Sequence, residues 1–191
     1  MIESLVIALF TAAVVGVMNL IVKAFEVCVN HKYQTKKLKL EKKMSINDSV
    51  EKNARLFLVS ADQVATAAKE FCEVNKMRLG NAIPENQAHN HAVQAGDNLN
   101  EGMEKTFSEI TSIKLILPDS NYKDEIIDNL EGVRSICEKI ASITMQVERN
   151  KEQLEYIEQK ELEIKKEISI LQNYVDKSIS RINCYINEDV K

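Results

Sequence analysis

Seven residues between Val50 and Phe71 repeat in strict heptad order, and no other feature of the chain constrains its fold as strongly. They are Val50, Ala54, Phe57, Ala61, Val64, Ala68 and Phe71, at spacings of 4-3-4-3-4-3. This spacing places all seven on one face of an α-helix, and such a face has to be covered by a neighbouring helix. Alternation of alanine with larger side chains predicts close packing against that neighbour; a ligand groove along the stripe is the alternative.

Helix breakers are scarce, with two prolines and five glycines in 191 residues. β-Sandwiches and barrels need many tight turns, so this composition excludes them. Tryptophan is absent and aromatic residues make up 5% of the chain, so the core is expected to be aliphatic. The sequence therefore predicts an all-α fold, in which one N-terminal transmembrane helix precedes a cytoplasmic antiparallel helical bundle or coiled coil of three to four long helices.

The few breakers give the expected helix boundaries. Asn47 or Asp48 is a suitable N-cap for the first cytoplasmic helix, and Gly80 is a suitable stop. Pro84 suits the first turn of the next helix, which should end before the second break at residues 118–121. The expected helices are about 48–79, 84–117, 121–148 and 151–187.

Each of the later helices also carries an apolar stripe. The second has Ala88, Ala92, Ala95, Leu99, Met103, Phe107 and Ile110. The third has Ile126, Leu130, Val133, Cys137, Ile140, Thr144 and Val147. The fourth has Leu154, Ile157, Glu161, Ile164, Ile168, Leu171 and Val175, and extends to Ile182 and Ile186. Because Gly96 and Gly102 flank a polar stretch, we expect the second helix to fray or kink there.

The heptad register slips between Glu148 and Leu154, where no proline or glycine interrupts the chain. A slip of this kind fits either a stammer in one long helix or a short turn between two helices. We favour a helix–turn–helix, because a pair of helices that folds back on itself buries both stripes.

A second constraint is the stretch Ser4–Val22, which contains no charged residue in 19 positions. As a helix it would be roughly 28 Å long, close to the hydrocarbon thickness of about 30 Å. The alternative is a cleaved signal peptide. No lysine or arginine precedes the stretch, however, and it exceeds the usual apolar length of about 7–15 residues in such peptides. The sequence therefore predicts a retained transmembrane span.

Lysines after this stretch predict its orientation. Residues 30–43 contain Lys32, Lys36, Lys37, Lys39, Lys42 and Lys43 against Glu41, a net charge of +5, whereas the whole chain has −4. The positive-inside bias places this flank in the cytoplasm and the N-terminus outside. We expect an anchor at 1–29, a basic juxtamembrane linker at 30–46 and a cytoplasmic helical domain at 47–191 of a single-pass inner-membrane protein.

The lysine block has two interpretations. It acts only as a topology determinant beside the headgroups, or it forms a specific site for anionic lipid, as blocks of about 4–8 basic residues beside a span can do. Both interpretations make the bilayer and its anionic headgroups near residues 30–43 the expected partners.

Small residues recur every four positions within the predicted span. Ser4, Ala8, Ala12 and Gly16 form this stripe, and Asn19 adds one polar group. Small-xxx-small stripes allow two membrane helices to approach closely, so we expect self-association through this face.

Sites for chemistry are not indicated. The four cysteines contain no Cys-x-x-Cys pair, and the predicted compartment is reducing, which argues against disulfides. His89 and His91 are two positions apart and would point to different faces of a helix, so we expect no metal site there. Positive charge is confined to one short block, which argues against nucleic acid as a partner. We expect no cofactor and no enzymatic activity.

The layout of the chain resembles that of small uncharacterised bacterial membrane proteins with one span and a cytoplasmic helical body. The segment Ser112–Pro118 with the following Asp-Ser-Asn is similar to a turn that such proteins place between two long helices. This resemblance implies no activity, cofactor or catalytic residue.

These features lead to two main functional hypotheses, and a hydrolase on a helical scaffold is a third. The first is a membrane-anchored scaffold or regulatory adaptor whose helical bundle binds itself or a protein partner. The alternative is a membrane effector, such as a toxin or defence component, that oligomerises through its span and perturbs the bilayer.

Overall fold

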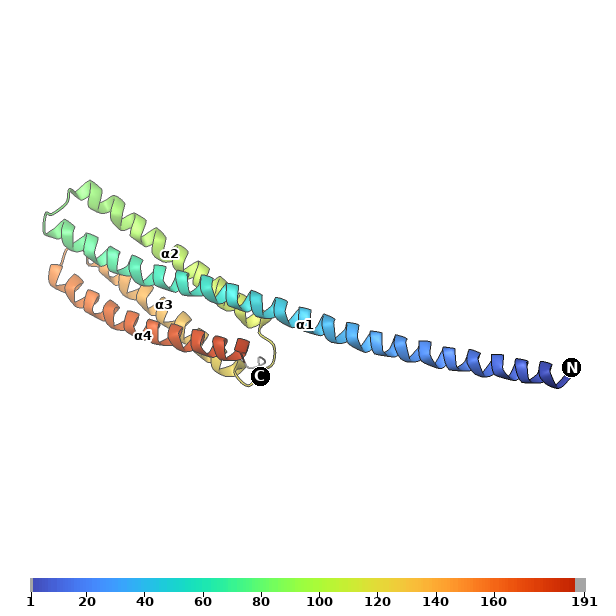
Figure 1. Ribbon diagram of the computed structural model, residues 1–191. Helices are drawn as coiled ribbons and strands as arrows, with labels where there is room; N and C mark the ends of the chain where they lie inside the picture. Colours follow the sequence, from blue (N-terminus) through green and yellow to red (C-terminus); the bar gives the residue numbers. More distant parts are fainter. Residues whose placement is uncertain (1, 188–191) are drawn as a thin grey trace. The chain divides into compact units, whose positions relative to one another are not determined.

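The described part of the chain is α-helical apart from three short connections, at residues 80–84, 117–122 and 150–153. The computed structural model describes the backbone of residues 2–187 and the side chains of residue 23 and residues 25–187. Four helices follow one another: α1 (Ile2–Leu79), α2 (Glu85–Ile116), α3 (Lys123–Arg149) and α4 (Leu154–Asn187) (Figure 1). No strand occurs in residues 2–187. The predicted all-α class is confirmed, with four helices.

The chain divides into two compact units, residues 1–45 and residues 46–191. The first unit consists of the N-terminal part of α1. The second unit contains the remainder of α1 together with α2, α3 and α4, which lie side by side as a helical bundle (Figure 1). The predicted helical bundle is therefore present in the second unit.

Side-chain pairs show which helices of the bundle are neighbours. The hydroxyl of Thr106 donates to Ser60 Oγ at 3.0 Å and joins α2 to α1, and Lys114 pairs with Glu131 and joins α2 to α3. Lys76 Nζ lies 2.7 Å from Glu161 and joins α1 to α4. α2 thus lies beside both α1 and α3, and α4 lies beside α1.

Two ion pairs fix the direction of α4 against α3. Lys139 Nζ lies 2.7 Å from Glu167, and Arg181 Nε lies 2.6 Å from Glu125. Residue numbers rise along α3 as they fall along α4, so the two helices are antiparallel. This is the arrangement expected of helices joined by the short turn after Arg149.

The heptad stripe of α1 forms part of the bundle core, as predicted. Its members are at most 6% exposed, and Phe57 is fully buried. The core also contains all the members of the α3 stripe. Both stripes belong to one core inside the bundle. The stripe of α1 is therefore buried by side chains within residues 46–191.

Glu161 is the polar member of the α4 stripe, and its charge is matched within the bundle. Lys76 of α1 and Lys165 of α4 each place Nζ 2.7 Å from one of its oxygens. The hydrogen bonds from Lys165 and Lys76 hold the pKa of the Glu161 carboxyl below its usual value. A charged residue at a seam position is tolerated because neighbouring helices supply its counter-ions.

Gly102 has a packing role that the sequence analysis did not identify. A Cβ atom there would lie 3.1 Å from both Cγ2 and the backbone N of Val64, which shows how closely α2 approaches α1. The helix is uninterrupted through Gly96 and Gly102, so the expected disruption between them is not observed.

The predicted start of a helix at about residue 48 is wrong. Asn47 and Asp48 lie inside α1, and the segment expected to be a linker, residues 30–46, is helical. No proline or glycine occurs between Gly16 and Gly80, and an asparagine or aspartate alone does not terminate a helix that can continue.

The other predicted breaks are observed. α1 ends at Leu79, and Asn81 adopts φ 53°, a left-handed conformation that asparagine tolerates well after a helix. Pro84 is the N-cap of α2. A turn at residues 150–153 separates α3 from α4, so the helix–turn–helix alternative is the correct one.

Within the part of the chain whose side chains are described, no helix is long and apolar enough to cross a membrane. The predicted span, residues 4–22, lies outside that part.

The central role of the α1 stripe can be tested with a matched pair of variants. Phe57→Asp should destabilise the bundle strongly, because truncating a buried phenylalanine alone costs about 3–5 kcal/mol and an unpaired buried charge adds to this. Leu56→Asp, at the neighbouring position that is 45% exposed, should have little effect. Thermal and urea unfolding of the full chain, followed by circular dichroism, measures both. Equal melting temperatures for the two variants would contradict the burial of Phe57.

Candidate functional site: a groove between α1 and α4

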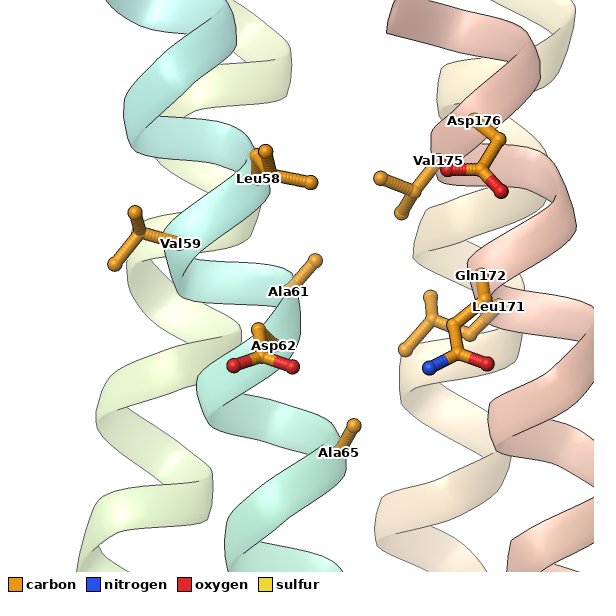
Figure 2. Close-up of a pocket in the computed structure, with 9 residues that line it drawn as sticks. All are labelled: Leu58, Val59, Ala61, Asp62, Ala65, Leu171, Gln172, Val175 and Asp176. Atoms are coloured by element: carbon orange, nitrogen blue, oxygen red, sulfur yellow. The ribbon is translucent and has the colours of Figure 1, made fainter.

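A largely apolar hollow with a volume of about 560 Å³ lies between α1 and α4. We call it the α1/α4 groove. Its apolar lining is contributed by Leu58, Val59, Ala61 and Ala65 from α1 and by Leu171 and Val175 from α4. In Figure 2, Leu58, Ala61 and Ala65 project from α1 toward α4, and Val175 projects back toward α1.

Side-chain size explains why a hollow forms here. Ala61 and Ala65 are 3% and 4% exposed, and their single methyl groups leave space above the closely packed backbone. Leu58 and Val59 are larger and remain 46% and 67% exposed. The groove therefore has a floor of small buried side chains, and apolar surface on its α1 side remains in contact with water.

Three polar residues complete the lining: Asp62 of α1, and Gln172 and Asp176 of α4. All three are exposed. Within the described residues, neither Asp62 nor Asp176 forms an ion pair or a side-chain hydrogen bond, and no lysine or arginine lines the groove. The α1/α4 groove is thus apolar and carries two carboxylates that form no ion pair, one on each wall.

The six lysines of residues 30–43 all lie on α1, in the first unit. Five of them are exposed, and Lys43 is half-buried. Lys37 lies 3.9 Å from Glu41 of the same helix, with both side chains more than half exposed, so this pair contributes little stability.

Spacing divides these lysines into two sets. Lys32, Lys36, Lys39 and Lys43 recur at intervals of 4-3-4, so they share one face of α1. The large apolar residues Phe25, Val29, Tyr33, Leu40 and Met44 are 49–71% exposed in the same segment. This part of α1 therefore presents both positive charge and apolar surface to its surroundings.

The predicted self-association stripe, Ser4, Ala8, Ala12, Gly16 and Asn19, lies outside the residues whose side chains are described. It remains a prediction.

The cysteines and histidines do not assemble into a site. Cys72 and Cys137 are fully buried, and burial raises their pKa from 9.0 to about 11 and about 12, respectively. Both thiols therefore stay protonated at neutral pH and pack as small apolar groups. His89 and His91 belong to α2. Among the described residues, no group of three or more His, Cys, Asp or Glu side chains is placed to hold a metal ion.

The sequence contains only a weak signal for the groove. Leu58 and Val59 lie outside the heptad stripe of α1, as does Leu56, and three large apolar residues outside one stripe indicate a second contact surface. Which helix lies beside that surface depends on the tertiary arrangement, so the contribution of α4 could not be read from the sequence.

No protein family model, curated protein or solved structure matches this chain.

The raised thiol pKa values predict a specific pattern of reactivity. At pH 8, Ellman's reagent should modify Cys28 and Cys184, which are exposed and half-buried, and should leave Cys72 and Cys137 unmodified until the chain is denatured. Because the folded-state pKa values lie above 9.0, these two thiols should weaken the fold only as the pH rises above 9 toward 11. Mass spectrometry of the modified protein identifies the sites. Rapid modification of Cys137 in the folded protein would contradict its burial.

Proposed function

We propose that this protein is a non-enzymatic, membrane-anchored adaptor, with residues 4–22 in the bilayer and the helical bundle in the cytoplasm as a binding module. The observation that supports this most strongly is the charge-free stretch Ser4–Val22. Nineteen residues of this composition are long enough to cross the hydrocarbon core. No proline or glycine occurs between Gly16 and Gly80. One helix can therefore contain both the proposed span and the first helix of the bundle.

The lysines support the proposed orientation. Seven lysines, Lys23 and the six of residues 30–43, follow the span within about 20 residues, the range in which positive charge directs topology, and none precedes it. Their contact with anionic headgroups depends on how the helix leaves the bilayer. A straight continuation would put Lys43 about 32 Å from residue 22, well beyond the Debye length of about 8 Å. Binding of anionic lipid by all six lysines therefore requires this helix to lie along the bilayer surface.

The bundle supports a binding role. Its interior is mainly aliphatic, and the buried hydroxyl groups of Ser60 and Thr106 are hydrogen-bonded to each other between α1 and α2. The α1/α4 groove is a part of this surface that combines apolar side chains with carboxylates that form no ion pair. An adaptor requires a stable scaffold and a surface of this kind, and it does not require a reactive group.

Topology is the first test of the proposal. A reporter that is active only in the cytoplasm, fused after Lys191, should be active, and the protein should sediment with membranes and resist extraction at pH 11. Replacing the six juxtamembrane lysines with glutamine should produce a mixed orientation, because it removes the charge that directs insertion. An active periplasmic reporter at the same position would contradict the cytoplasmic assignment.

Self-association through the span gives a second test. Gly16→Ile should reduce cross-linking between full-length chains several-fold without reducing membrane insertion, because a bulky side chain prevents close approach of the two helices. Val15→Ile is a matched control that leaves the small-residue stripe unchanged.

The effector alternative has a different outcome in the same cells. An effector whose spans cluster should collapse the membrane potential on expression, and Gly16→Ile should restore it. An adaptor should leave the potential unchanged in both cases.

A further inference from the structure

We infer that the α1/α4 groove binds a basic amphipathic helix of a partner protein. This inference rests on the proposed adaptor function and specifies the chemistry of the partner. It follows from one juxtaposition, in which an open apolar groove between two antiparallel helices has an unpaired carboxylate on each wall.

The apolar surface determines the form of the partner. Leu58 and Val59 are 46% and 67% exposed, so the groove is open to solvent on one side and cannot enclose a small molecule as typical ligand pockets do. An amphipathic helix fits such a surface by placing apolar side chains at i, i+4 and i+7 in the groove. Ala61 and Ala65 form the floor that would receive these side chains, and Val175 faces them from α4 (Figure 2).

The two carboxylates determine which charge the partner should carry. Asp62 and Asp176 lie on α1 and α4, so they flank the apolar floor from opposite sides (Figure 2). Neither carboxylate forms an ion pair in the described part of the chain, although Lys177 follows Asp176 directly, and Gln172 adds a neutral donor and acceptor. Lysines or arginines on both sides of the partner's apolar stripe would meet a carboxylate each, and this complementarity fixes register and increases the association rate.

Charge also excludes a second copy that binds groove to groove. Such a contact would bring Asp62 and Asp176 of one chain toward the same residues of the other, and like charges placed together disfavour binding. An acidic helix is disfavoured for the same reason.

Binding can be measured with full-length protein in phosphatidylcholine nanodiscs, which carry no net charge that would attract the probe. The probe is a synthetic 18-residue helix with leucines at i, i+4, i+7 and i+11 and lysines on both sides of this stripe. We expect saturable binding by fluorescence anisotropy. The double variant Asp62→Asn/Asp176→Asn should weaken binding about tenfold, and Leu58→Ser should weaken it several-fold. A peptide with glutamate in place of lysine should not bind.

Two control variants separate the groove from the rest of the surface. Leu56→Ser changes a leucine of the same exposure on the same helix outside the groove, and Asp48→Asn removes an exposed carboxylate of α1 that does not line it. Both should bind the peptide like the parent protein. Circular dichroism of every variant confirms that the bundle is intact.

Equal affinity of the parent and the two groove variants would overturn the inference. Tighter binding of a peptide with the sequence of residues 25–44 than of the synthetic helix would also overturn it, in favour of a second copy as the occupant. Failure of the proposed anchor can be distinguished from failure of the proposed groove. A chain that does not enter nanodiscs contradicts the adaptor proposal, whereas the peptide titration reports on the groove in either case.

Discussion

Burial of the heptad stripe of α1 is the constraint on which the rest of the bundle depends. The stripe needs cover along one side only, and α4 has 34 residues, the same number as residues 46–79 of α1. α2 and α3 are of similar length. The three helices can therefore pack against the part of α1 in the second unit, but they are too short to pack against the rest of α1 as well. The stripe is buried from Val50 to Phe71, whereas Val29, Tyr33 and Leu40 of the first unit stay exposed.

Much of this fold could be predicted because heptad spacing and helix breakers are local signals. The stripes, the turn after Leu79 and the change of register near Arg149 were all readable from residue order. The helix start predicted at Asn47 is wrong because a capping residue alone does not end a helix in a segment that no glycine or proline interrupts. Gly102 was misjudged because its value depends on Val64, a residue 38 positions away that only the tertiary structure brings close. The groove was missed for the same reason.

Polar pairs between helices set the register that apolar stripes leave open. Sliding one aliphatic stripe along another changes burial little, but it separates ions that are paired. Glu167 is 3% exposed and receives its hydrogen bond from Lys139 at 2.7 Å, so a shift of α4 against α3 would leave a buried carboxylate without a partner. Removing one member of such a pair is far more costly than the pair is stabilising. The same reasoning applies to Glu161 between α4 and α1.

Separation of charge along the chain links the proposed anchor to the proposed partner. Residues 30–43 have a net charge of +5, while residues 44–191 carry 18 lysines and arginines against 26 aspartates and glutamates. At an anionic bilayer this distribution would attract the first segment and repel the bundle, which would keep the α1/α4 groove available from the cytoplasm. The acidic body would also favour encounters with basic proteins before any specific contact forms. In this arrangement the basic segment determines where the protein is held, and the acidic groove determines what it binds there.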